Sequence, residues 1–163
     1  MKPLVLLLLL LSSSALAEEP QAFVRGSWQG LRQEHAGRPM IVHFWGVTCG
    51  PCLAELPRWG EFIGEKPGVD VVMVAADPVV GEQKAIAGAL AKAGCAAAES
   101  WIFADPFVDR LAYEVDQNWA GELPYTLLVG ADGSVAAILG EVEFSELRVW
   151  VAEQARLATG GRS

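Results

Sequence analysis

The residues of this sequence best suited to covalent chemistry are two cysteines three positions apart, Cys49 and Cys52. An apolar run over 40–45 precedes them, and Gly50 and Pro51 lie between them. Side chains three apart in the first turn of a helix lie on one face, close enough to form a disulfide. A helix N-terminus favours a thiolate, the species that attacks disulfides. The spacing therefore predicts a disulfide-exchange pair, with Cys49 as the nucleophile and Cys52 as the resolving thiol.

Other interpretations of the same pair are a structural disulfide, two inert thiols in a redox-silent docking module, and the Cu(I) site of a metallochaperone. The loop between the two cysteines is too short to stabilise much of a fold, which favours chemistry. Two thiolates suffice for Cu(I), whereas a structural zinc site normally needs four ligands, and only Cys95 remains. We expect no metal and no cofactor. We expect Cys95 to be a buried small residue, with a link between two chains as the alternative.

The first residues have the pattern of a secretory signal. A basic start is followed by an apolar run from Leu4 to Leu11 and by the small residues Ala15 and Ala17. This predicts a signal peptide over 1–17, cleaved after Ala17, and a periplasmic or otherwise exported protein. The apolar run is short for a membrane span, and an uncleaved anchor is the alternative.

Charge and length limit what the rest of the chain does. The 163 residues carry a net charge of −8, and no cluster of Lys or Arg stands out, so the sequence argues against nucleic-acid binding. The chain beyond the signal has the length of one domain. We expect a linker over 18–22, the domain over 23–158, a flexible tail over 159–163, and a monomer.

Strands and helices are expected to alternate. Apolar runs and turn signals predict strands at 40–45, 69–76, 101–103, 126–129 and 135–139. Helices are expected at 27–34, from 50 onward, at 82–93 and at 106–113. Pro57 should kink or break the second of these, and Gly94 should stop the third. A last helix is expected at the C-terminal end, with an apolar side formed by Phe144, Leu147, Trp150, Val151 and Leu157. This order predicts a three-layer α/β domain with a terminal hairpin and helix.

The chain resembles one known family, the exported TlpA/ResA-like branch of the thioredoxin superfamily. The resemblance covers about residues 40–139 and rests on His-Phe-Trp-Gly at 43–46, Cys-Gly-Pro-Cys at 49–52, Glu55, Pro57, Leu-Pro-Tyr-Thr-Leu-Leu-Val at 123–129, Asp-Gly at 132–133, and Asp105 with 111–115. It implies a thioredoxin-like fold, in which helices flank a central mixed sheet. It also implies a periplasmic thiol-disulfide oxidoreductase. Such proteins often serve as reductants in cytochrome c maturation.

The resemblance implies partners and part of the substrate site. Protein disulfides, such as those of apocytochrome c, would be the substrates, and a membrane protein would supply electrons. Pro124 would follow a cis peptide bond and face the cysteines, while the backbone of Leu123 binds the substrate chain as an added strand. A trans proline in a turn is the alternative. Thr48 stands where thioredoxins commonly carry Trp, so it would contact partners at the rim. Leu123 stands where smaller or β-branched residues are frequent.

Four further residues have two interpretations each. By strand alternation and family analogy His43 would point toward Cys52 and take its proton, or it is a hydrogen-bonded core histidine. Glu55, one turn after Cys52, would adjust the pKa of the thiols, or it is an exposed acid. Trp45 and Tyr125 would frame the substrate groove, or they belong to the core.

Two points of the sequence remain. The Gly-Pro pair between the cysteines resembles that of thioredoxin, and this resemblance implies a reductase, while export into an oxidising space leaves oxidase or isomerase work open. His35, the other histidine of the chain, is expected on the surface.

Overall fold

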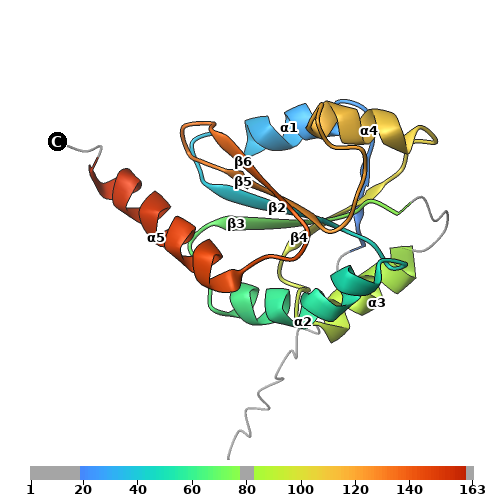
Figure 1. Ribbon diagram of the computed structural model, residues 1–163, viewed down its shortest axis with the longest axis horizontal. Helices are drawn as coiled ribbons and strands as arrows, with labels where there is room; N and C mark the ends of the chain where they lie inside the picture. Colours follow the sequence, from blue (N-terminus) through green and yellow to red (C-terminus); the bar gives the residue numbers. More distant parts are fainter. Residues whose placement is uncertain (1–18, 78–82, 161–163) are drawn as a thin grey trace, which may run out of the picture.

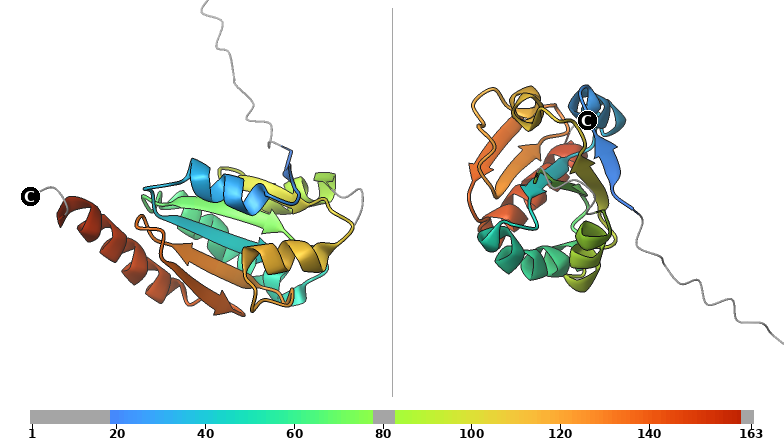
Figure 2. Two further views of the ribbon diagram at one scale, coloured as in Figure 1. Left: turned by 90° about the horizontal axis from the view of Figure 1, so that it is seen from above. Right: turned by 90° about the vertical axis from the view of Figure 1, so that its right-hand side faces the viewer.

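The fold is a six-stranded mixed sheet between two layers of helices (Figures 1 and 2). The computed structural model describes residues 19–77 and 83–160. Its strands are β1 (Gln21–Phe23), β2 (Met40–Trp45), β3 (Asp70–Ala75), β4 (Glu99–Phe103), β5 (Tyr125–Val129) and β6 (Val135–Leu139). Its helices are α1 (Ser27–Glu34), α2 (Gly50–Gly64), α3 (Gln83–Lys92), α4 (Val108–Val115) and α5 (Phe144–Gly160). The predicted α/β class is confirmed.

The strand order, β1-β4-β3-β2-β5-β6, places β2 between β3 and β5. β3 runs parallel to β2 and ends beside it, with Ala75 opposite Trp45. β5 runs antiparallel to β2 and begins beside its end, with Tyr125 opposite Phe44. The topology therefore brings three loops together at one edge of the sheet: the loop after β2, the loop after β3 and the loop before β5.

β2 is buried along its whole length, as a central strand with helices on both faces must be. Met40, Val42 and Phe44 pack on the side covered by α1 and α4, whereas Ile41 and Trp45 pack on the side of α2 and α3 (Figure 1). Burying each of these side chains contributes about 1.5–3 kcal/mol. The strict alternation fixes which face each residue of β2 presents.

Helix α2 begins immediately after the first cysteine. Cys49 is the N-cap in extended backbone, and its Sγ accepts a hydrogen bond from the backbone N–H of Cys52 at 3.2 Å. Pro51 lies in the first turn, where its missing N–H costs no hydrogen bond. Pro57 lies inside α2 and does not interrupt it, because the helix continues to Gly64.

Two expected domain boundaries are wrong. Within the expected linker 18–22, Gln21 and Ala22 belong to β1 and pair with Trp101 and Ile102 of β4. Within the expected tail 159–163, α5 continues to Gly160. The predicted signal peptide over 1–17 and residues 161–163 lie outside the described residues.

Helix α4 begins two residues later than predicted. Phe107 is its N-cap, and Pro106 precedes the helix. The side chain of Asp105 accepts a hydrogen bond from the backbone N–H of Phe107 at 2.9 Å, forming a turn that delays the first helical residue to Val108. The predicted position of Pro106 within the first turn of the helix is therefore wrong, because Pro106 precedes the N-cap.

Two other helix ends bear on the predictions. α3 ends at Lys92, one residue before the predicted end, and Gly94 follows with a φ of 81° in the left-handed region, while Glu82 lies outside the described residues. On α5 only Phe144 and Leu147 are buried, and Leu157 is 63% exposed. The C-terminal part of α5 extends beyond the sheet (Figure 2), so its expected apolar side is covered at one end only.

Candidate active site

The two cysteines of the exchange motif form a disulfide at the N-terminus of α2. Their Cα atoms are 5.2 Å apart, within the range for a disulfide. Cys49 is partly exposed between the exposed residues Thr48 and Gly50, while Cys52 is fully buried. Of the two residues, Cys49 is therefore the one that solvent reaches, and the roles of Cys49 as nucleophile and Cys52 as resolving thiol stay predictions.

Pro124 directly precedes β5, at the same edge of the sheet at which β2 ends and leads into the two cysteines. The Leu123–Pro124 peptide bond is cis, as the resemblance implied. Pro124 is buried. Leu123 is partly exposed and packs against the apolar cores on both faces of the sheet. Leu123 is thus placed where its backbone can meet a chain that approaches Cys49.

His43 is fully buried in β2, on the face covered by α2. Its ring lies 4.4 Å from the ring of Trp59, and its Nδ1 is 2.9 Å from the Oγ1 of Thr126. Burial lowers the pKa of His43 from 6.5 to about 3. The imidazole is therefore neutral and too weak a base to take a proton from Cys52. The expected base role of His43 loses its chemical support, and the core interpretation fits the contacts.

Glu55 is also buried, with 2% of its surface exposed, so the interpretation as an exposed helix acid is wrong. Its two carboxylate oxygens accept hydrogen bonds from the Nε1 of Trp59 and from the backbone N–H of Val142. Burial raises its pKa, and these two hydrogen bonds partly oppose that effect. Its Oε2 lies 3.7 Å from the Nε2 of His43, which has no hydrogen-bond partner among the described residues. The site thus holds a carboxyl group with a raised pKa one turn from Cys52.

The two aromatic residues expected at the substrate groove belong to the core. Trp45 is fully buried on the α2 face. Tyr125 is 5% exposed on the opposite face, where its ring stacks on Trp119 and its hydroxyl donates to the carboxylate of Asp116. Since neither ring reaches the surface beside Cys49, the groove interpretation is wrong for both, and Thr48 and Leu123 remain as rim residues.

Sequence reasoning missed Asp77, a buried carboxylate that contacts the loop before the nucleophile. Its Oδ2 accepts two hydrogen bonds from Thr48, one from the backbone N–H at 2.7 Å and one from the hydroxyl at 2.8 Å. The available signal was its position two residues after the end of β3, because the ends of parallel strands meet at one edge of a sheet.

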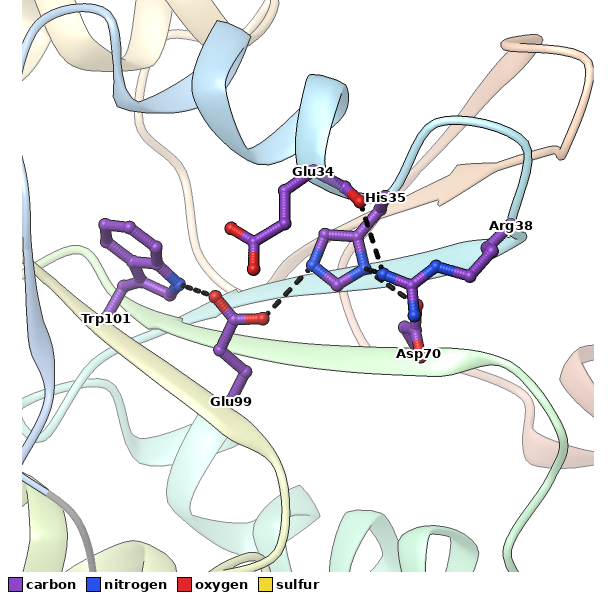
Figure 3. Close-up of polar contacts among 6 residues, drawn as sticks. All are labelled: Glu34, His35, Arg38, Asp70, Glu99 and Trp101. Carbon is purple, nitrogen blue, oxygen red and sulfur yellow. Dashed lines mark hydrogen bonds and ion pairs between the residues drawn. The ribbon is translucent and has the colours of Figure 1, made fainter.

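His35 lies at the other end of β3 and β4, and its expected surface position is wrong. It is 7% exposed at the end of α1 (Figure 3). Its Nδ1 lies 2.7 Å from the carboxylate of Asp70, and its Nε2 lies 3.1 Å from that of Glu99. Arg38 contacts the same oxygen of Asp70 at 3.1 Å. Because Asp70 and Glu99 begin β3 and β4, this cluster joins α1 to the sheet away from the dithiol.

Cys95 is buried, as expected, and takes no part in the site. Its Sγ lies 3.6 Å from the carbonyl oxygen of Leu56 and donates to it. Burial raises its pKa to about 11, so the thiol stays protonated and unreactive near neutral pH.

Two further features concern the described residues as a whole. Across 19–77 and 83–160, no group of three His, Cys, Asp or Glu side chains is arranged to hold a metal ion. Within the same ranges, none of the helices has the length and apolarity that crossing a membrane requires.

The chain is similar in sequence to curated proteins, among them two from Geobacillus, while no protein-family model matches it. The thiol-disulfide oxidoreductase ResA of Geobacillus thermodenitrificans is 30% identical over 109 residues. The ResA of Geobacillus kaustophilus has the same identity over the same length. Each match covers 65% of this chain and 56% of the relative, so the chain spans little more than half the length of these relatives.

Solved structures share the fold. A secreted Mycobacterium tuberculosis disulfide oxidoreductase homologous to E. coli DsbE has a TM-score of 0.60 at 21% identity, covering 74% of this chain and 85% of that one. A thioredoxin-related protein from Neisseria meningitidis serogroup B has a TM-score of 0.58 at 26% identity, with 76% and 90% coverage. These likenesses confirm the thioredoxin-like fold. The chain thus has a thioredoxin-like fold and is similar in sequence to two ResA thiol-disulfide oxidoreductases.

Proposed function

We propose that this protein is an exported thiol-disulfide oxidoreductase that reduces disulfides in partner proteins. The observation that carries the proposal is the Cys49–Cys52 disulfide, in which Cys49 is a partly exposed residue at a helix N-terminus and Cys52 is buried. The ResA relatives, which are named as oxidoreductases, support the activity. The signal-like segment 1–17 supports export, and the secreted structural relative has the same fold.

In the proposed cycle the reduced protein transfers two electrons to its substrate. The Cys49 thiolate attacks one sulfur of the substrate disulfide, forming a mixed disulfide and releasing the other sulfur as a thiolate. Cys52 then loses its proton and attacks the Sγ of Cys49, which expels the second substrate sulfur. The substrate leaves as a dithiol and the protein leaves with the Cys49–Cys52 disulfide. A dithiol of a membrane electron donor then reduces that disulfide again.

Glu55 is the group that we assign to the proton of Cys52. The two residues lie one helical turn apart on the buried face of α2. Burial raises the pKa of Glu55, which makes its carboxylate a better base than an exposed one. His43 packs against Trp59 and faces Glu55, so we assign it a positioning role in place of the base role.

The substrate chain is proposed to bind beside Leu123. This residue precedes the cis-proline and is partly exposed next to the end of β2. An extended chain that hydrogen-bonds to this backbone would present its disulfide to Cys49, as an added strand does at a sheet edge. Disulfides of extended or unfolded proteins, such as apocytochrome c, meet this requirement.

Trapping tests the proposal. Cys52→Ala leaves the nucleophile in place and removes the thiol that resolves the mixed disulfide, so partner proteins should remain attached to Cys49. Cys49→Ala is the matched control and should trap none. The proposal would be refuted if both variants trapped partners equally. It would also be refuted if Cys52→Ala trapped none and the wild type failed to reduce insulin disulfides. Stoichiometric Cu(I) binding by such an inactive protein would indicate the metallochaperone instead.

A further inference from the structure

Asp77 contacts the active-site loop in a way that the proposed catalytic cycle does not use. It follows β3, the strand that runs parallel to β2, and only 6% of its surface is exposed. Its Oδ2 accepts both the backbone N–H and the hydroxyl of Thr48, at 2.7 and 2.8 Å. Thr48 directly precedes Cys49, so this one carboxylate oxygen holds the residue next to the nucleophile at two points.

The other carboxylate oxygen of Asp77 fills the space that a side chain at position 46 would need. A Cβ added to Gly46 would lie 1.4 Å from the Oδ1 of Asp77, a distance that no real contact allows. That oxygen is buried and has no hydrogen-bond partner among the described residues. The carboxylate is therefore enclosed by the loop 46–48, and its negative charge is only partly compensated.

We propose that Asp77 is a positioning residue for Cys49, which also sets the redox balance of the dithiol through its charge. The proposal rests on the proposed function of the Cys49–Cys52 pair. The two hydrogen bonds to Thr48 fix the backbone from which the nucleophile projects. The buried charge is held against Thr48, the residue before Cys49, and disfavours a thiolate at Cys49, because like charges repel most strongly where water is excluded. A less stable thiolate destabilises the reduced protein and makes the dithiol a stronger reductant.

The reduction potential of the Cys49–Cys52 pair, measured against glutathione, tests the charge effect. Asp77→Asn keeps an oxygen that can accept from Thr48 and removes the charge. The equilibrium constant should shift about fivefold toward the dithiol, which makes the potential about 20 mV less negative. Asp132→Asn is the matched control, because Asp132 accepts from the backbone N–H and the hydroxyl of Ser134 in the β5–β6 turn. Asp132→Asn should leave the potential at the wild-type value.

A second variant separates the charge effect from loosening of the loop. Thr48→Val removes one hydrogen bond and leaves the charge of Asp77 less compensated, so the potential should become more negative, opposite to the effect of Asp77→Asn. Loss of loop order alone would move both variants in the same direction, and that result would overturn the proposal. A wild-type potential in folded Asp77→Asn would also overturn it.

Attack by Cys49 tests the positioning, including the case in which Asp77→Asn does not fold. The rate of Cys49 attack on a small aromatic disulfide should be about threefold lower in Thr48→Val than in Thr48→Ser, which keeps the hydroxyl. Equal rates in these two variants would overturn the positioning role. A wild-type protein that does not exchange with glutathione at all would instead refute the proposed function, so the two failures are distinguishable.

Discussion

Replacing His43 by Asn should remove a large part of the acid sensitivity of the fold. In the unfolded chain His43 takes up a proton near its ordinary pKa of 6.5, while burial lowers its pKa in the folded protein to about 3. Below pH 6.5 the unfolded state therefore binds more protons than the folded state, and stability is lost as the pH falls. The stabilisation is fully present above pH 6.5.

The magnitude follows from the size of the pKa shift. Each pH unit below 6.5 costs about 1.4 kcal/mol until the folded pKa is reached. Lowering the pH from 7.5 to 5 should therefore cost the wild type about 2 kcal/mol that His43→Asn does not lose. His35, with its partners Asp70 and Glu99, is present in both proteins, so its contribution cancels in the comparison.

Urea unfolding of the oxidised proteins at pH 5 and pH 7.5 measures this difference. His43→Asn loses packing against Trp59, and that loss is the same at both pH values. The quantity to compare is therefore the free energy of unfolding of the wild type minus that of the variant, and how this difference changes between the two pH values. A difference that stays constant within about 0.5 kcal/mol between the two pH values would refute the reasoning, since a buried neutral imidazole cannot give that result.

Three other perturbations have defined outcomes. Gly60→Ala places a Cβ 1.8 Å from the carbonyl oxygen of Ala93, so thermal unfolding should show a loss of about 2–3 kcal/mol in the free energy of unfolding. Gly64→Ala, whose Cβ meets no atom within 4 Å, should be neutral or slightly stabilising. Cys95 should stay unlabelled by iodoacetamide at pH 8 in the folded, reduced protein, because it is buried and its pKa is raised to about 11; labelling as fast as that of the active-site pair, seen by peptide mass spectrometry, would contradict this. Burial raises the pKa of Glu55, so the wild type should lose stability as the pH rises through the raised pKa, and Glu55→Gln should lack this loss. Free energies of urea unfolding that change in parallel for the two proteins from pH 4 to pH 8 would exclude the effect.

The parts of the fold with strong local signals could be predicted from the sequence. The continuous apolar run of β2 and the turn chemistry of the β5–β6 hairpin placed those strands within one residue. β1 was missed because a three-residue edge strand has too few positions for a pattern, and it exists only through its pairing with β4. The resemblance implied the cis bond before Pro124, which no local pattern indicates.

The site was predicted less completely, because burial of polar groups depends on partners distant in sequence. The sequence left two interpretations of Glu55 open, because the backbone N–H of Val142 that donates to its carboxylate lies 87 residues later in the chain. His35 is buried by carboxylates that begin β3 and β4 (Figure 3). The base role of His43 depended on an ordinary pKa, and the enclosed position between Trp59 and Thr126 removes that basis.

The measurement that tests the central claim most directly is the redox equilibrium of the Cys49–Cys52 pair with glutathione, followed by mass spectrometry of alkylated protein. We expect a reversible two-electron couple near about −270 mV, the range of a reductant. A couple near about −120 mV would mark an oxidant and contradict the proposed direction. A disulfide that does not exchange with glutathione in the folded protein would contradict the proposed activity itself.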